Sequence, residues 1–284
     1  MFLGTPEAAV VPLRAVVESG HDVRLVVTRP DKRRGRGGAL VPSPVKAAAV
    51  ELGLPVSTSV DDVIGAGAEL GVVVAFGRLI KPHVLAAVPM VNVHFSLLPR
   101  WRGAAPVERA ILAGDVETGV CLMTLEEGLD TGPVHARETV PIGPEETADE
   151  LRSRLVAVGT RLLVAQLAEG LTPPVPQEGE ATYAAKLEPA ELHLDWTQPA
   201  VQIHRVVRVG GAWTTWRGKR IGVLSARLAA EVAGGPPGQL DGLLVSTGEG
   251  ALVLVEVQPE GRGRLSAAAW RHGARPKPGE RFGS

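Results

Sequence analysis

Three polar side chains between residues 91 and 133 have the types and spacing to carry out chemistry together. Asn92 and His94 lie two residues apart in an apolar run, so in a strand both side chains point to the same face. Asp130 follows in a turn bounded by glycines. An amide and an imidazolium can donate hydrogen bonds to the oxyanion of a carbonyl under attack, and a nearby carboxylate can relay protons through water.

Each of these residues taken alone has a simpler interpretation. A single Asn or His in a strand is more often a hydrogen-bonded core residue, and Asp130 has the setting of an ordinary turn residue. The combination is more specific, because all three are expected at strand ends on the ligand-binding edge of an α/β sheet. No nucleophile-elbow pattern and no metal-ligand spacing occur in the sequence. The predicted reaction is direct, metal-free acyl transfer between two bound substrates.

The elements around this stretch predict an α/β fold. The chain begins with a short strand, a tight turn, a helix and a buried strand, which is the order of a βαβ unit and implies a parallel sheet. Continuous apolar strands indicate a sheet covered by helices on both faces. The expected strands are 2–3, 21–28, 54–57, 69–75, 91–95, 118–125 and 133–140, and the expected helices are 7–19, 45–52, 60–68, 104–113 and 145–168.

A change of composition divides the chain. Residues 171–190 are rich in proline and charge, which is typical of an extended linker. After a helix near 199–209, short β-like runs separated by glycine-rich turns predict a small barrel or sandwich. The expected organisation is a first domain over 1–170, a linker over 171–190 and a second domain over 191–284.

The composition excludes several classes of protein. The single Cys121 rules out an internal disulfide and, within an apolar run, is expected to be an inert core thiol. There is no uncharged apolar stretch long enough to span a membrane and no signal peptide, so a cytoplasmic protein without membrane contact is expected. We also expect a monomer. The net charge of -1 does not by itself indicate nucleic-acid binding, although residues 190–284 carry an excess of Lys and Arg.

A long basic loop precedes Ser43. It carries five cationic side chains against a single acid, Asp31, and its glycines and charges exclude a core role. Two interpretations remain: a solvated surface loop, or an arm that grips phosphates and becomes ordered on its partner. The cationic side chains are Arg29, Lys32, Arg33, Arg34 and Arg36.

Two motifs around the three polar residues resemble those of a known family. Asn92-Val93-His94 with Ser96-Leu97-Leu98-Pro99, and Leu129-Asp130-Thr131-Gly132, are similar to the signatures of the folate-dependent formyltransferase superfamily. Within it the chain resembles the methionyl-tRNA formyltransferase family over nearly its whole length. The motifs that carry this narrower resemblance are Gly4-Thr5-Pro6, Pro42-Ser43-Pro44-Val45-Lys46, the run from Arg100 to Pro106, the run from Tyr183 to Leu187, and Asp195-Trp196.

The resemblance implies a fold and a reaction. The fold is a Rossmann-like formyltransferase domain followed by a small OB-like β-barrel that helps to hold tRNA. The reaction moves the formyl group of 10-formyltetrahydrofolate to the α-amino group of methionine on initiator Met-tRNA. Asn92 and His94 would hold the oxyanion, and Asp130 would assist the proton transfer.

The resemblance also suggests binding residues. The folate would lie against the turn that follows the strand 91–95, and its pterin would lie beside a second turn that follows the strand 69–75. Phe76, Leu79 and Ile80, in that second turn, have an equally simple interpretation as core residues. The tRNA would contact the basic loop, where Arg36 matches the family's loop arginine. The expected folate residues are Ser96, Leu97, Leu98, Pro99, Phe76, Gly77, Leu79 and Ile80, and the expected tRNA residues are Lys32, Arg33, Arg34 and Arg36.

The sequence leaves three alternative functions open. A formyltransferase acting on another amine would share the three polar residues but should lack the basic loop and the second domain. A formyl-tetrahydrofolate hydrolase would be expected to carry an added N-terminal regulatory domain. A non-catalytic tRNA-binding relative would tolerate loss of Asn92, His94 or Asp130.

Two departures from the family pattern bear on the fold. The first strand is very short, so either residues precede Met1 in the natural chain or the sheet is weakened there. The run Gly210-Gly211-Ala212-Trp213 differs from the family's usual sequence at the same place.

Overall fold

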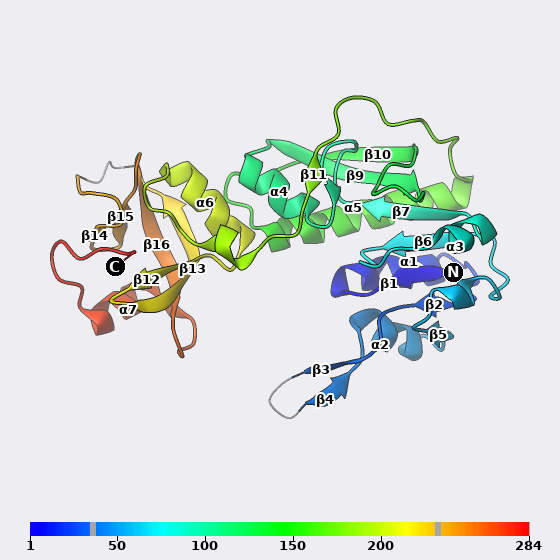
Figure 1. Ribbon diagram of the computed structural model, residues 1–284, viewed down its shortest axis with the longest axis horizontal. Coiled ribbons are helices and arrows are strands. Elements are labelled where there is room, and N and C mark those ends of the chain that lie inside the picture. Colours follow the sequence, from blue (N-terminus) through cyan, green and yellow to red (C-terminus); the bar gives the residue numbers. More distant parts are fainter. Residues whose placement is uncertain (35–37, 231–233, 284) are drawn as a thin grey trace. The chain divides into compact units, whose positions relative to one another are not determined.

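The computed structural model describes residues 1–34, 38–230 and 234–283 (Figure 1). The chain forms two compact units, which we describe separately. The first unit contains the segment expected to do chemistry, and the second contains the predicted β domain. The first unit comprises Met1–Val107, Glu117–Pro141 and Glu150–Ala185, and the second comprises Glu108–Val116, Ile142–Asp149 and Lys186–Ser284.

Within the described residues, a seven-stranded sheet organises the first unit, in the order β10-β9-β7-β6-β1-β2-β5. The five strands from β7 to β5 run parallel, whereas β9 and β10 are antiparallel. The predicted mostly parallel sheet is therefore confirmed. The strands are β1 (Phe2–Gly4), β2 (Val26–Val27), β5 (Val56–Ser57), β6 (Gly71–Val74), β7 (Met90–His94), β9 (Glu117–Thr124) and β10 (Val134–Pro141).

Helices cover both faces of this sheet, as predicted. On one face α5 lies against β7 and β9, so closely that a Cβ on Gly159 would meet Val93 at 2.8 Å. On the other face Val84 and Val63 join a buried cluster with Leu3 and Val73. The helical elements up to residue 169 are η1 (Glu7–Ala9), α1 (Val10–Glu18), α2 (Pro44–Glu51), η2 (Asp61–Val63), α3 (Pro82–Ala87), α4 (Pro106–Ala113) and α5 (Ala148–Glu169); most of α4 belongs to the second unit.

The short strand β1 lies in the interior of the sheet. It pairs with β2 on one side and with β6 on the other. The side chains of Phe2 and Leu3 are completely buried. A short strand suffices because Phe2 and Leu3 are paired with both neighbouring strands and Gly4 is paired with Val74.

The basic loop differs from its prediction. Its two ends pair as an antiparallel hairpin of β3 (Lys32–Arg34) and β4 (Ala39–Val41), which projects from the sheet in Figure 1. Its high content of arginine, lysine and glycine concealed the pairing, because such residues are uncommon in strands. Arg36, at which the sequence placed the family's loop arginine, lies outside the described residues.

The segment predicted as a linker runs extended along the first unit. Its β11 (Tyr183–Ala184) pairs in parallel with β8 (Arg102–Gly103), and Val175 forms a backbone bridge with Val134. We refer to residues 171–185 as the strap. Proline and charge predicted its extended backbone but could not indicate its pairing partners.

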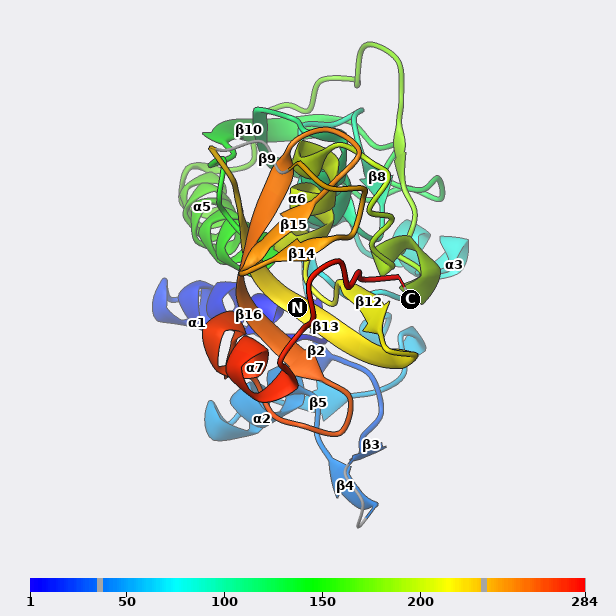
Figure 2. The same cartoon turned by 90° about the vertical axis from the view of Figure 1, so that its left-hand side faces the viewer.

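The second unit is an antiparallel β structure, which confirms the prediction of a separate small β domain. Its sheet has the order β12-β13-β16-β15-β14, with β17 paired to β16. Figure 2 shows the long strands β13 and β16 of this unit and α7 against β16. The elements are η3 (Pro189–Leu192), α6 (Ala200–Val209), β12 (Trp213–Trp216), β13 (Lys219–Leu228), β14 (Leu240–Asp241), β15 (Leu244–Ser246), β16 (Ala251–Pro259), β17 (Leu265–Ser266) and α7 (Ala267–Ala274).

Aromatic rings fill the core of the second unit. Phe282 stacks on Trp196 at a centroid distance of 5.3 Å and on Trp270 at 5.8 Å. The indole N–H of Trp196 donates to the hydroxyl of Thr214 at 3.0 Å, so its polar atom is satisfied inside the core. The last described residues of the chain are thereby tied into this unit.

Two further predictions concern single features. Cys121 is buried beside Leu98, Met123 and Val134, and this burial raises the pKa of its thiol, as expected of an inert core cysteine. Across the described ranges, no helix has both the length and the apolar character needed to cross a membrane.

The second unit also buries an ionisable group. The side chain of His204 in α6 is almost completely buried, and its Nε2 lies 3.2 Å from Oε2 of Glu145. Burial lowers the pKa of His204 below its ordinary value of 6.5, with Glu145 acting in the opposite direction and Arg208 adding to the decrease.

This lowered pKa predicts a pH-dependent stability. As pH falls through 6.5 the unfolded chain gains a proton at His204 that the folded chain does not take up, so stability is lost on acidification. The loss from this one group is at most about 1.4 kcal/mol per pH unit. In urea unfolding followed by tryptophan fluorescence at pH 7.5 and 5.5, His204→Gln should show a smaller difference than the wild type. His272→Gln, an exposed control, should keep the wild-type difference; an unchanged difference in His204→Gln would contradict the assignment.

Candidate active site

The end of β7 presents the two polar side chains that the sequence singled out. Asn92 pairs in register with Val73 of β6 and with Met123 of β9, so both neighbouring strands fix its position. His94 lies two residues further on the same face and is 5% exposed. Asn92 is half-buried and is the only asparagine in the chain.

Asp130 joins them from the turn between β9 and β10. Its Oδ1 lies 3.5 Å from Nδ2 of Asn92, and its Oδ2 lies 3.6 Å from Nδ1 of His94. The side chains of His94 and Asp130 are 6% and 11% exposed, so their interaction is largely shielded from water. The structure thus brings together the three residues that the sequence proposed as one constellation.

The hydrogen bonds of His94 determine which of its nitrogens is available. Nε2 lies 2.9 Å from the carbonyl oxygen of Trp101, and because a carbonyl can only accept, Nε2 carries a proton. Nδ1 is left facing the carboxylate of Asp130. A second proton on the ring would therefore reside at Nδ1, beside Asp130 and near the amide of Asn92.

The backbone on both sides of the site has an unusual conformation. Asp130 has a φ of 50° and Trp101 a φ of 62°, both in the left-handed region that non-glycine residues rarely adopt. Gly103 has a φ of 121°, and its N–H donates to Oδ2 of Asp130 at 2.8 Å. A Cβ on Gly103 would lie 2.9 Å from the carbonyl oxygen of Ala184 in the strap, so only glycine fits there.

The strap holds both of these turns. Nε2 of Gln177 donates to the backbone carbonyls of Asp130 and Gly132, each at 2.8 Å. Oε1 of the same side chain accepts from Arg102, at 3.1 Å from Nε and 2.7 Å from Nη2. The hydroxyl of Thr182 accepts the N–H of Trp101 at 2.9 Å. The strap therefore holds the Trp101 turn that orients His94 and the Asp130 turn that completes the site.

Sequence reasoning missed Gln177 and Thr182. Gln177 contacts Asp130, which lies 47 positions earlier in the chain, so no local pattern connects the two. The resemblance of Tyr183 to Leu187 to the family pointed to this region but not to those two side chains.

The turn after β7, expected to bind folate, has a buried and an accessible part. Ser96 is completely buried and donates to the carbonyl of Arg100 at 2.6 Å, and Leu98 packs in the core with Cys121 and Met123. Leu97 and Pro99 are half-buried. Ser96 and Leu98 thus support the turn from inside, and the accessible surface belongs to Leu97 and Pro99.

The second group expected at the folate follows β6, the strand next to β7. Phe76 and Ile80 are 3% and 5% exposed and pack in the core cluster, which agrees with their alternative interpretation as core residues. Gly77 is exposed with a φ of 64°, and Leu79 is 79% exposed. Of these four residues, Gly77 and Leu79 are accessible to a ligand.

Three of the four residues expected to bind tRNA, Lys32, Arg33 and Arg34, form β3 of the basic hairpin. Lys32 and Arg33 are exposed, and Nη1 of Arg33 donates to the carbonyl of Gly38 at 3.2 Å. The backbone of Arg34 pairs with Ala39. In the part of the chain that the structure describes, no group of three or more His, Cys, Asp or Glu side chains is arranged to hold a metal ion.

Comparison with known proteins identifies what the chain is similar to. A formyl transferase family model matches residues 1–167, and a model of the formyl transferase C-terminal domain matches residues 186–275. The methionyl-tRNA formyltransferase of Symbiobacterium thermophilum is 44% identical over 307 residues, which span 99% of this chain and 94% of that protein.

Solved structures support the fold. The N-formyltransferase from Helicobacter canadensis, in complex with folinic acid and dTDP-3-aminofucose, superposes with a TM-score of 0.70 at 18% identity, covering 91% of this chain and 98% of that one. Methionyl-tRNA formyltransferase from Clostridium thermocellum superposes with a TM-score of 0.55 at 20% identity, covering 62% and 82% of the two chains.

The contacts of Gln177 predict a local effect on the Asp130 turn. Gln177→Ala removes two donors, each contributing about 1 kcal/mol, so backbone amides of residues 126–133 should exchange with deuterium roughly ten-fold faster or more. Gln258→Ala, which removes an exposed side-chain amide from the second unit, serves as the matched control. Equal exchange in residues 126–133 of Gln177→Ala and the wild type would show that the strap does not hold this turn.

Proposed function

The chain belongs to the methionyl-tRNA formyltransferase family, and from that premise we propose that it transfers the formyl group of 10-formyltetrahydrofolate to the α-amino group of methionine on initiator tRNA. The observation that carries the proposal is the convergence of Asn92, His94 and Asp130 at the end of β7. Amide, imidazole and carboxylate are suited to acyl transfer to an amine without a covalent enzyme intermediate.

The reaction balances as an addition followed by an elimination. The lone pair of the neutral amine attacks the formyl carbon, a nitrogen–carbon bond forms, and the carbonyl electrons move onto oxygen. Collapse of this tetrahedral species breaks the bond between the formyl carbon and N10 of the folate. The proton lost by the amine ends on N10, so no external acid or base is consumed.

We assign the negative oxygen to Asn92 and His94. One N–H of the Asn92 amide is directed at Asp130, which leaves the second N–H for the substrate oxygen. His94 would donate from Nδ1 when that nitrogen carries the second proton of an imidazolium, because its Nε2 is already held by Trp101. Both side chains are held in position before the substrate arrives, which is the condition under which such hydrogen bonds favour the transition state.

We assign the proton movement to Asp130. Its carboxylate adjoins Nδ1 of His94 and accepts the N–H of Gly103, so it remains in place throughout the reaction. A carboxylate there can take a proton from the attacking amine through water and return it to N10.

Folate binding is proposed for the two turns that flank the end of β7. Leu97, Pro99, Gly77 and Leu79 provide the accessible surface, while Ser96, Leu98, Phe76 and Ile80 support it from within. The Helicobacter canadensis relative, which has the same fold, is described in complex with folinic acid, and this supports a folate as the formyl donor.

Recognition of tRNA is proposed for the basic hairpin and the second domain. Lys32, Arg33, Arg34 and Arg36 would contact backbone phosphates, which makes binding salt-dependent. The proposed organisation is a formyltransferase domain over 1–170, a linker over 171–190 and an OB-like tRNA-binding domain over 191–284. An enzyme that acts on aminoacyl-tRNA works where proteins are synthesised, so we propose a cytoplasmic location. We also propose that the protein is a monomer.

A second acceptor class follows from the neighbouring structures. The Helicobacter canadensis relative is described with an aminosugar nucleotide, so an amine on another small molecule is the alternative acceptor. Identity over nearly the full length of a methionyl-tRNA formyltransferase favours Met-tRNA. Incubation with 10-formyltetrahydrofolate and Met-tRNA, in initiator and elongator forms, distinguishes the two, since only the first proposal requires formyl-Met-tRNA as product.

The role of Asn92 predicts a loss of rate with retention of binding. Asn92→Ala removes one oxyanion donor and should lower kcat about 10²- to 10³-fold at saturating folate and Met-tRNA. Gln258→Ala, which removes an exposed amide from the second unit, should leave kcat unchanged. Near-wild-type turnover of Asn92→Ala at saturation would remove Asn92 from the mechanism.

A further inference from the structure

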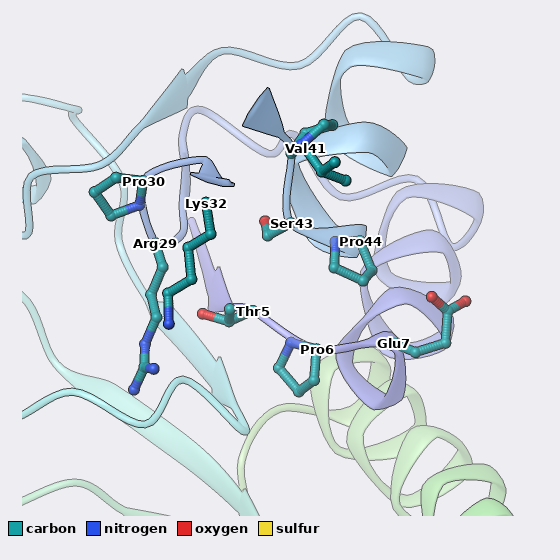
Figure 3. Close-up of a pocket in the computed structure, with 10 residues that line it drawn as sticks. Thr5, Pro6, Glu7, Arg29, Pro30, Lys32, Val41, Ser43 and Pro44 are labelled. Carbon is teal, nitrogen blue, oxygen red and sulfur yellow. The ribbon is translucent and has the colours of Figure 1, made fainter. Parts of the chain in front are cut away.

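A pocket lies at the same edge of the sheet as the reaction centre. It is a pocket of about 320 Å³ in the first unit (Figure 3). Three separate segments form it: the turn after β1, the residues after β2, and the end of β4 with the start of α2. The residues used below are Thr5, Pro6, Arg29, Lys32, Ser43 and Pro44.

Most polar groups in the walls are already engaged. The hydroxyl of Ser43 lies 2.7 Å from that of Thr28 and caps α2 by accepting the N–H of Lys46 at 3.0 Å. The carboxylate of Asp31, the nearest acid in sequence to the two cations, pairs with Nζ of Lys46 at 2.8 Å. These contacts fix Ser43 in the wall and pair Asp31 with Lys46, which does not line the pocket.

Two cationic side chains remain directed along one wall. In the view of Figure 3 the side chains of Arg29 and Lys32 both extend past Thr5, with Pro6, Glu7 and Pro44 on the opposite side. The Nε of Arg29 is buried and has no hydrogen-bond partner among the described residues, while another nitrogen of the same guanidinium donates to the carbonyl of Gly77. Glu7 is the only acid among the lining residues, so the lining carries a net positive charge.

The strand register places this pocket relative to the reaction centre. Gly4 pairs with Val74, and Val74 pairs with Val93, so Thr5 and His94 each follow the same rung of the sheet. Two strand spacings of about 4.8 Å put Thr5 about 10 Å from His94. Leu3 pairs with Val27, so Arg29 aligns with Thr5 one strand further away, at about 14 Å from His94.

We propose that this pocket binds the 5′-phosphate of the terminal adenosine of the acceptor tRNA, with Arg29 and Lys32 as the phosphate ligands. The inference rests on the proposed function, because it takes a methionine esterified to the 3′-hydroxyl as the acceptor. Eight bonds join the attacking amine to that phosphorus. Each bond of an extended chain advances it by about 1.25 Å, so the phosphorus can lie at most about 10 Å from the amine. This reach corresponds to the distance of about 10 Å between His94 and Thr5, and the side chain of Arg29 extends past Thr5 in Figure 3.

The shape of its guanidinium explains why Arg29 suits this role. A guanidinium offers five N–H donors in a planar arrangement that matches phosphate oxygens, and one edge of Arg29 is already held by Gly77. Lys32 adds a mobile point charge from the base of the hairpin. The pocket therefore distinguishes acceptors with a phosphate at this distance from methionine derivatives that lack one.

Equilibrium binding of two acceptor analogues tests the proposal without requiring turnover. The probes are 3′-methionylamino-3′-deoxyadenosine and its 5′-phosphate, in which an amide replaces the labile ester. The wild type should bind the 5′-phosphate at least ten-fold more tightly. In Arg29→Gln and Lys32→Gln this ratio should fall toward one, while the Kd of the unphosphorylated analogue changes less than two-fold. Arg24→Gln, an exposed arginine paired with Asp22, is the matched control and should keep the wild-type ratio.

Each outcome decides the matter. A wild-type ratio near one, which needs no variant, overturns the pocket assignment, and so does a ratio retained in both Arg29→Gln and Lys32→Gln. Arg29→Lys, which restores the charge, should recover part of the ratio. Failure of the wild type to formylate Met-tRNA would instead contradict the proposed function. Formylation is measured in a separate assay, so the two failures can be distinguished.

Discussion

The carboxylate of Asp130 is the point on which the site depends, because three separate parts of the chain meet there. One oxygen faces the Asn92 amide, and the other faces His94 and accepts the N–H of Gly103. Asn92 and His94 need only the alternation of one strand to lie side by side. Their relation to Asp130 requires a turn with a left-handed residue, and that conformation persists only where surrounding contacts maintain it.

Those contacts come from a segment whose composition suggests a passive connection. In the strap, Gln177 binds the Asp130 turn and Thr182 binds the Trp101 turn. Strand β11 of the strap also pairs with β8, which directly follows Trp101. The parallel sheet supplies an edge with converging strand ends, and the strap crosses the turns that emerge from it. Fold and site are thereby linked, because the segment that leads to the second unit also holds the turn that carries Asp130.

The sequence predicted those features that arise from local patterns. Apolar runs identified the strands of the sheet, and the spacing of Asn92 and His94 placed both on one face. It did not predict the β3–β4 hairpin, because Lys32, Arg33 and Arg34 have no strand-like pattern. Nor did it predict Gln177 or the pocket at Arg29, since both arise where segments distant in sequence come together. Phe76 and Ile80 illustrate the remaining ambiguity: their types suited either a ligand or the core, and the structure buries them.

The central claim is that Asn92, His94 and Asp130 act as one unit held by the Asp130 carboxylate. A double-mutant cycle with Asn92→Ala and Asp130→Ala in single-turnover formyl transfer to Met-tRNA tests it most directly. Groups that act as a unit have non-additive effects, so the double variant should be about as slow as the slower single variant. Rate losses that multiply in the double variant would contradict the account, because Asn92 and Asp130 would then act independently.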